Sequence, residues 1–384
     1  MDNNSVKKAF FKSKAVQAIS ITLIVALGLW GSFLAGRESA MKSNDTDENI
    51  QISDADTPLG AFVTSSGGRV VGKAFVVDSK AGLVSNSVKS ATANTKLINE
   101  AFVKAAKSGI KIVRIVGDFY VESSGWANRY SSPLTQQNKN PRSSSAFGII
   151  VPSGFTLDLT DATLRMKPNG SPCYVLINVA NADGVTILNG TLIGDSSQHD
   201  FSSGGTHEHG HGVMINNSKN VTVTGMKISG MTGDGINLIS YVGEKDIENV
   251  QINNNRISNC RRQGISIASG VKTIVTNNTI TNIGGTAPEY GIDVELQEGF
   301  KCDGTVISNN TINNCRGGSV LAYNGNNYKI IDNNCGNGNI IAYLCQNVVI
   351  KNNQMLYTYV SVSEYAVNVD ASIPDPTKAV LSVS

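Results

Sequence analysis

The chain has 384 residues, of which 16% are charged and 6% are aromatic, and its formal net charge is +2. A charge so close to zero provides no basic field for a phosphate backbone, so nucleic acid is excluded as a partner. The length is sufficient for one large hydrophobic core, and we expect one main folded domain.

The start of the chain predicts attachment to a membrane. Lysines gather in residues 1–14, which we assign to the cytoplasm, and residues 15–36 then carry no charged side chain up to Arg37. An apolar run of this length can span about 30 Å of hydrocarbon, and no small-residue cleavage site follows it. We therefore predict an uncleaved transmembrane anchor, with a cleaved signal peptide as the alternative. Either way the remainder is extracellular, as a membrane-anchored or a secreted protein.

Residues 37–57 are polar and lack aromatic side chains, which is typical of a flexible stalk. We expect the folded domain to comprise residues 58–384. Its first part, with the alternating segment GRVVGKAFVVD, predicts short strands. Apolar residues then recur at helical spacing, so a helix over about residues 95–108 is predicted to cover the open end of the domain.

A short β-rich phrase recurs eight times and ends on the same kind of polar residue. Steps of 28, 36, 29, 23, 32, 24 and 19 residues separate the marked positions, which are Asp161, Asn189, Gly225, Asn254, Asn277, Asn309, Asn333 and Asn352. Such a period is typical of stacked coils, because one coil cannot bury its apolar face alone. The predicted fold class is all-β, a parallel β-helix, and the general rule for parallel crossovers makes it right-handed. Asparagine suits the marked position because it tolerates a left-handed backbone and its amide can bond to the next coil.

The order of these elements resembles the pectate-lyase-like, pectin-lyase-fold superfamily. The resemblance rests on the helix, on GIIVPSGFTLDLTDATL, on VLINVANADGVTILNGTLIGD and on the GHGV and GDGI phrases, and it covers about residues 95–353. It implies a right-handed parallel β-helix. It also implies action on, or binding of, a polysaccharide, because the superfamily includes polysaccharide lyases, glycoside hydrolases, sugar epimerases and phage tailspikes. The paired aspartates and RIK of polygalacturonases are absent, so their mechanism is not carried over.

A second register aligns the strand starts HGVMIN, DGINLI, QGISIA and YGIDVE. The residues directly before the aligned glycines are expected to stack, namely His211, Asp234, Gln263 and Tyr290. Alternation then points Asn237, Asp293 and Glu295 away from the core. Four side chains are predicted to share one solvent-facing strip over three adjacent coils: Asp234, Arg262, Asp293 and Glu295. Carboxylates gathered with an arginine in this way are candidate catalytic residues.

The spacing of these carboxylates favours a glycoside hydrolase. Asp234 and Asp293 are predicted to lie two coils apart, about 9–10 Å at backbone level, and Asp293 and Glu295 about 6.5–7 Å apart along one strand. Both distances suit the acid and base of an inverting glycosidase, which hold a water between them and need no cofactor. The alternative is a polysaccharide lyase with Arg261 or Arg262 as base and Ca²⁺ held by the carboxylates. A non-catalytic, adhesin-like glycan-binding protein and a trimeric phage-type appendage are further alternatives, so monomer and trimer both stay open.

The longest step contains the insert SSQHDFSSGGTHEHGHG, which holds all four histidines. We expect it to form a loop beside the strip and predict no metal, because no further ligand follows at a known spacing. A metal site or a general base, with His207, Glu208 and His209 as donors, is the alternative. The predicted substrate contacts are His209, His211, Asn237, Arg261, Gln263 and Tyr290, the last as a platform for a sugar ring. The structural alternatives are that Asp234 only caps a tight turn and that the two arginines are only solvated or paired with Glu289.

The six cysteines are interpreted as buried free thiols. Cys260 and Cys315 recur in matching places two coils apart, which is too far for a disulfide. If Cys315 and Cys335 lie on neighbouring coils, they could form a disulfide, and the sequence does not decide whether they are bonded or free.

Overall fold

The computed structural model describes residues 69–78, 87–123, 148–202, 204–241, 244–355, 360–362, 370–371 and 381–383. The predicted cytoplasmic segment, anchor and stalk, residues 1–57, lie outside the described residues. Within the described ranges, no helix is long and apolar enough to cross a membrane.

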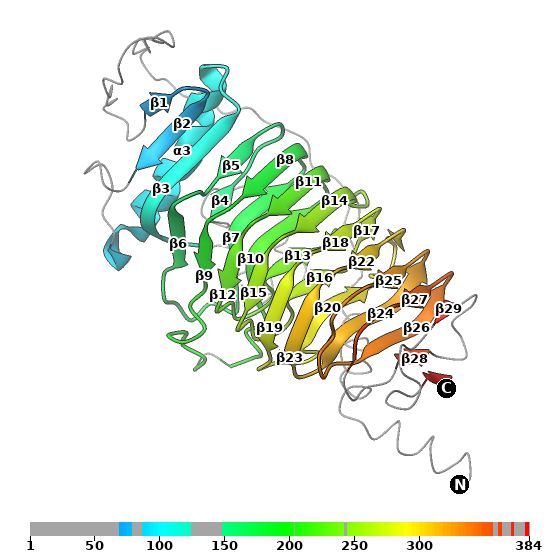
Figure 1. The fold of residues 1–384 in the computed structure, drawn as a ribbon. Coiled ribbons are helices and arrows are strands. Elements are labelled where there is room, and N and C mark those ends of the chain that lie inside the picture. Colours follow the sequence, from blue (N-terminus) through cyan, green and yellow to red (C-terminus); the bar gives the residue numbers. More distant parts are fainter. Residues whose placement is uncertain are drawn as a thin grey trace.

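The predicted solenoid is present: the chain winds through three parallel sheets that run along one axis (Figure 1). The first sheet, which carries the strand starts of the second register, contains β4 (Ile149–Ile150), β7 (Cys173–Ala180), β10 (His209–Asn216), β13 (Ile236–Leu238), β16 (Ile265–Ile267), β20 (Tyr290–Glu295), β24 (Gly318–Asn326), β26 (Ile340–Gln346), β28 (Val360–Val362) and β30 (Leu381–Val383). Every pairing between successive members is parallel, as a stacked coil requires.

The other two sheets close each coil. The second sheet contains β2 (Ala74–Asp78), the first part of β3 (Ile112–Val121), β5 (Thr156–Asp158), β8 (Asp183–Leu188), β11 (Lys219–Thr224), β14 (Glu248–Asn253), β17 (Gly270–Val271), β18 (Ile274–Thr276), β21 (Cys302–Asp303), β22 (Val306–Ser308), β25 (Lys329–Ile331), β27 (Val349–Lys351) and β29 (Asp370–Ala371). The third contains the second part of β3, β6 (Ala162–Met166), β9 (Thr191–Ile193), β12 (Lys227–Ser229), β15 (Arg256–Ser258), β19 (Thr279–Ile283) and β23 (Thr311–Cys315).

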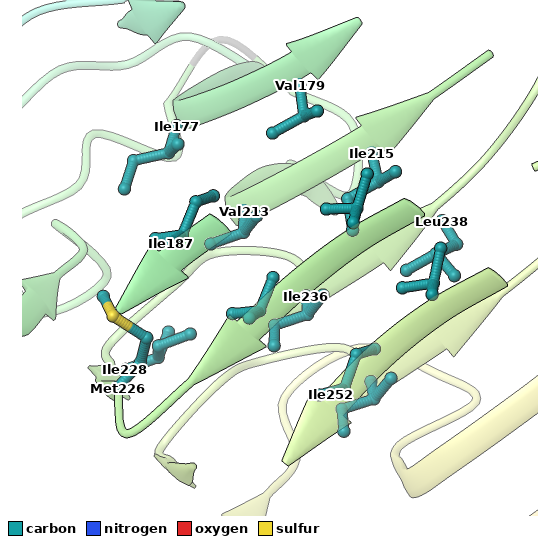
Figure 2. Close-up of a cluster of buried hydrophobic side chains, with 14 of the residues drawn as sticks. Ile177, Val179, Ile187, Val213, Ile215, Met226, Ile228, Ile236, Leu238 and Ile252 are labelled. Carbon is teal, nitrogen blue, oxygen red and sulfur yellow. The ribbon is translucent and has the colours of Figure 1, made fainter. Parts of the chain in front are cut away.

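Aliphatic side chains fill the inside of the coils in columns, as the alternation predicts. Ile177, Val213 and Ile236 lie in register on successive strands of the first sheet, and all three are fully buried. Figure 2 shows these columns beside side chains from the other sheets, such as Ile187 and Ile228. The core therefore runs continuously through the solenoid, so each coil buries the apolar face of the next.

Asparagines stabilise the turn between the second and third sheets through two adjacent columns rather than one. The left-handed column contains the marked residues Asp161 to Asn309, then Asp332 and Asn352. The amide ladder lies one residue later, at Asn255, Asn278, Asn310, Asn333 and Asn353, whose side chains are buried and bonded from coil to coil at 2.9–3.0 Å. The prediction placed Asn333 in the left-handed column, which is wrong by one residue: Asp332 occupies that column and Asn333 belongs to the amide ladder. One asparagine cannot both form the left-handed turn and point its amide into the stack.

The predicted cap is confirmed, although it starts earlier than the apolar spacing indicated. A short 3₁₀ turn, η2 (Val88–Ser90), leads into α3 (Ala91–Lys107), which lies across the end of the solenoid near β2 and β3 (Figure 1). Phe102 packs edge-on against Phe155, with ring centroids 5.4 Å apart. The predicted short strands before the cap are also present, since β1 (Arg69–Val71) pairs with β2.

Asn99 of α3 bonds the exposed backbone of β4: its amide donates to the Gly148 carbonyl at 2.9 Å and accepts from the Ile150 N–H at 2.8 Å. We expect Asn99→Ala to lower the free energy of unfolding by about 1–3 kcal/mol, because both backbone groups lose their partners. Chemical denaturation measures the change. Lys96→Ala, on the exposed face of the same helix, is the control, and equal losses in the two variants would contradict the capping role.

The cysteines are free thiols, as predicted, and five of the six are buried. Cys315 and Cys335 are not paired. Burial raises the pKa of Cys260 to about 12, so this thiol stays protonated and serves only as a small apolar group of the core.

Candidate functional site

The outer face of the first sheet brings the predicted site residues together in register. Strand pairing places Asn237 of β13, Ser266 of β16 and Asp293 of β20 in one column. The predicted stack before the glycines is also present, because Asp234 lies between His211 and Gln263 on neighbouring coils. The site therefore occupies β10, β13, β16 and β20, near the middle of the solenoid (Figure 1).

The expectation of a solvent-facing strip is wrong for the two aspartates, whereas Arg262 and Glu295 are partly exposed. Asp234 and Asp293 have no exposed surface, and Asn237 is 5% exposed. Alternation along a strand decides only whether a side chain points into the coil or out of it. It does not determine what lies over the outer face, and here long polar side chains pack on one another above the sheet. The carboxylates are therefore desolvated, which matters for their chemistry.

Asp234 lies among groups that favour its charged form. Its carboxylate accepts from the Asn237 amide at 2.8 Å and from Arg262, whose Nη1 lies 3.3 Å from both carboxyl oxygens. Burial raises the pKa of Asp234, and the Arg262 guanidinium opposes this rise. Glu208 lies on the other side of Arg262, with 3.6 Å between its Oε2 and Nε. Arg262 is thus held charged between two carboxylates.

His211 contacts the same aspartate as a neutral imidazole. Its Nδ1 lies 3.2 Å from the Asp234 backbone nitrogen and 3.3 Å from the Asp234 Oδ2. Burial, His209 and Arg262 all lower the pKa of His211 well below its ordinary value, in agreement with the neutral form. His209 is about one-third exposed and lies 3.7 Å from Glu208.

Asp293 has a different environment from Asp234. The side-chain amide of Gln263 donates to its Oδ2 through Nε2. The other end of the same amide, Oε1, accepts the Tyr290 backbone N–H at 2.9 Å, and this bond fixes the orientation of the amide. The other oxygen, Oδ1, is buried and has no hydrogen-bond partner among the described residues. Burial and the nearby Glu295 raise the pKa of Asp293 well above its ordinary value. Asp293 therefore keeps its proton to a higher pH than Asp234 does.

The remaining two site predictions, Arg261 and Tyr290, do not hold as made. Arg261 turns away from the carboxylates, packs on the Phe201 ring at 4.4 Å and donates to the Thr206 carbonyl at 3.1 Å. Arg262 contacts the Asp234 carboxylate, whereas Arg261 bonds backbone carbonyls and packs on Phe201. The Tyr290 ring packs in a cluster with Leu321 and Tyr323, so it offers no open ring face to a sugar.

Two further groups of the insert have roles that the sequence did not indicate. Glu208 pairs with Arg262, and His199 and His207 form a buried chain with Asp195. In this chain His199 Nδ1 lies 2.8 Å from Asp195 Oδ2, and His199 Nε2 lies 2.7 Å from His207 Nδ1. Only tertiary packing brings these residues together, because their spacing matches no known pattern. The described residues contain no group of three or more acidic, histidine or cysteine side chains arranged to hold a metal ion.

Comparison with known proteins supports the fold. A family model described as the right handed beta helix region matches residues 174–300, which span the site. Two Bacillus subtilis (strain 168) proteins are each 30% identical: the uncharacterized protein YclG over 53% of this chain, and the SPbeta prophage-derived uncharacterized protein YorA over 62%. This chain spans only 35% and 42% of their lengths.

Among solved structures, the exopolygalacturonase from Thermotoga maritima is 13% identical, with a TM-score of 0.47, and the match covers 76% of this chain and 88% of that protein. The family match agrees with the predicted right-handed parallel β-helix as a likeness of fold.

Proposed function

We propose that this protein hydrolyses glycosidic bonds of a polysaccharide, with Asp293 as the general acid and Asp234 as the general base. The observation that supports this proposal is the contrast between two buried carboxylates on one face of the sheet. Asp234 is paired with the permanent charge of Arg262, whereas Asp293 has one oxygen held by Gln263 and the other without a partner among the described residues. Environments that separate the pKa values of two carboxyl groups assign the acid and the base.

In the proposed reaction, Asp293 Oδ1–H gives its proton to the glycosidic oxygen as the bond to the anomeric carbon breaks. Asp234 accepts a proton from a water that attacks the same carbon from the opposite side. The two aspartates lie two coils apart, about 9–10 Å at backbone level, which leaves room for this water and predicts inversion of configuration. Burial, first, and the neighbouring Glu295, second, raise the pKa of Asp293 and so favour its protonated form before the reaction.

The other side chains supply contacts to sugar hydroxyls. The Asn237 Oδ1 is buried and has no hydrogen-bond donor among the described residues, so it can accept a hydrogen bond from a sugar hydroxyl. His211 and His209 border the same site. Gln263 acts through Asp293, since both ends of its amide are already used.

The lyase alternative needs an arginine that can lose its proton. Arg262 is a poor base because the nearby carboxylates Asp234 and Glu208 raise its pKa despite its burial, and Arg261 lies against Phe201. The carboxylate oxygens of Asp293 and Glu295 are of the type that Ca²⁺ prefers, and an ion held there would neutralise a uronate carboxylate. We therefore keep a Ca²⁺-dependent lyase as the second candidate.

The test incubates the full-length protein with a panel of bacterial and plant polysaccharides, with and without a chelator. New reducing ends without absorbance near 235 nm would support hydrolysis, and the same ends with that absorbance would establish a lyase. Binding without turnover on every glycan would favour an adhesin-like protein. The name of the prophage-derived relative keeps a phage-type appendage as an alternative, and a trimeric native mass would favour it.

We propose an extracellular location, membrane-tethered or secreted.

Arg262→Gln is expected to move the acidic limb of the pH–rate profile upward by about 1–2 pH units. Without the guanidinium the pKa of Asp234 rises further, so the base becomes protonated, and activity is lost, at a higher pH. The measurement is kcat/KM against pH. Arg261→Gln is the matched control and should leave the limb in place. An unchanged limb in Arg262→Gln would exclude Asp234 as the base.

A further inference from the structure

The outer face of the first sheet changes character in the two coils that follow Asp293 and Glu295. In register with Asp293 come Leu321 and Ile341, and in register with Glu295 come Tyr323 and Tyr343. The columns that carry carboxylates on β20 therefore carry apolar and aromatic side chains on β24 and β26. A ligand that extends from the carboxylates toward the C-terminal end of the solenoid would meet this second surface next.

The aromatic rings there are ordered by their own packing. Tyr323 and Tyr343 stack with centroids 5.6 Å apart and ring planes at 7°. Together with Tyr290 and Leu321 they form a hydrophobic cluster separate from the core inside the coils. Rigid tyrosines of this kind offer contact area at little cost in conformational entropy, and their apolar rings suit the C–H faces of sugars.

A depression of about 360 Å³ lies against this cluster and is lined by the segment 296–300, Tyr323 and Asn324. We call it the Tyr323 depression. Tyr323 in its wall is in register with Glu295 on the neighbouring strand, so the depression lies one coil away from the carboxylates of the proposed reaction. Its volume is within the range of small-ligand sites, about 300–1,000 Å³.

One polar atom in this wall lacks a partner. The side-chain oxygen Oε1 of Gln297 is buried and has no hydrogen-bond donor among the described residues. A buried amide oxygen without a donor costs about 1–3 kcal/mol, and a ligand hydroxyl would satisfy it. Glu298 is the only charged residue that lines the depression, so its surface contains a carboxylate and no cation.

We infer that the Tyr323 depression is a subsite for a neutral sugar ring of the polysaccharide, on the C-terminal side of the carboxylates. The inference rests on the proposed function, because the occupant is the next part of the same substrate chain. The ring lies against Tyr323, and one of its hydroxyls donates to Gln297. The carboxylate of Glu298 disfavours uronate residues at this subsite. The substrate therefore runs along the solenoid axis across β20, β24 and β26.

The experiment measures binding and cleavage of defined oligosaccharides by the full-length protein. The probes are neutral oligomers of glucose, of galactose and of N-acetylglucosamine, from two to eight units, and oligogalacturonates of the same lengths. We expect a neutral series to bind more tightly as units are added, and Gln297→Leu and Tyr323→Leu each to weaken the long members about tenfold and the shortest members little. Gln251→Leu, an exposed glutamine on β14 of the second sheet, is the matched control.

The possible results distinguish failure of the subsite proposal from failure of the proposed hydrolysis. Unchanged affinity for every length in both variants overturns the subsite, whether or not the wild type cleaves. Tighter binding of oligogalacturonates than of every neutral series also overturns it. Length-dependent binding that both variants weaken, without cleavage, would support the subsite and reject hydrolysis. If Tyr323→Leu unfolds, Gln297→Leu alone decides, and absence of binding by any probe rejects both proposals.

Discussion

Asp293→Asn is expected to reduce the rate of glycosidic cleavage by about 10²–10⁴-fold while binding of the polysaccharide is retained. The substitution keeps the shape of the side chain and removes the proton that Oδ1 would give to the leaving oxygen, and general acid catalysis contributes a factor of this size. New reducing ends give the rate, and direct titration of the glycan gives the affinity. In the wild type, activity should fall as pH rises through the elevated pKa of Asp293, because the acid is then ionised.

The same variant tests the environment of Asp293 through stability. A carboxyl group whose pKa is raised in the folded state binds more protons than in the unfolded state, so wild-type stability decreases as pH rises from about 4 through the elevated pKa. Asp293→Asn should show a smaller decrease, because Asp234 and Glu295, whose pKa values are also raised, remain. Asp332→Asn, an exposed turn residue in a column of asparagines, is the control and should match the wild type in rate and in pH dependence. Full activity in Asp293→Asn would exclude Asp293 as the acid.

Asn310→Ala is expected to lower the free energy of unfolding by more than about 3 kcal/mol. The Asn310 amide accepts the backbone N–H and the side-chain amide of Asn278 at 2.9 and 3.0 Å, and it donates to the Val275 carbonyl and the Asn333 side chain at 3.0 and 2.9 Å. Removing it leaves several buried polar groups without partners, each of which costs about 1–3 kcal/mol. Denaturant unfolding followed by circular dichroism measures the loss.

An exposed asparagine on the same coil provides the comparison. Asn314 has a left-handed backbone, with φ of 53°, and bonds only the Asn282 side chain, at 2.7 Å. Asn314→Gly keeps the backbone conformation and should cost less than about 1 kcal/mol, because water can replace an exposed hydrogen bond. If Asn310→Ala costs no more than Asn314→Gly, the buried ladder is not what stabilises the turn.

The fold followed from the sequence because its signals are local and repeated. Alternation assigned Ile236 and Leu238 to the inside of the coil, and both are buried in parallel register with their neighbours. The helix at the end of the solenoid was predicted from apolar spacing, since a helix and a strand have different periods. The stack of His211, Asp234 and Gln263 was also predicted, because aligned glycines fix the register of successive coils.

Tertiary structure decided what surrounds each of these residues. Asp234 and Asp293 look alike in the sequence, yet one lies against Arg262 and the other against Gln263, and this difference alone assigns their proposed roles. The sequence determined the solenoid, its cap and the face that carries the carboxylates, because these depend on periodicity along the chain. Burial of that face, the different partners of Arg261 and Arg262, and the position of Glu208 depend on packing between segments distant in sequence, which no local pattern records.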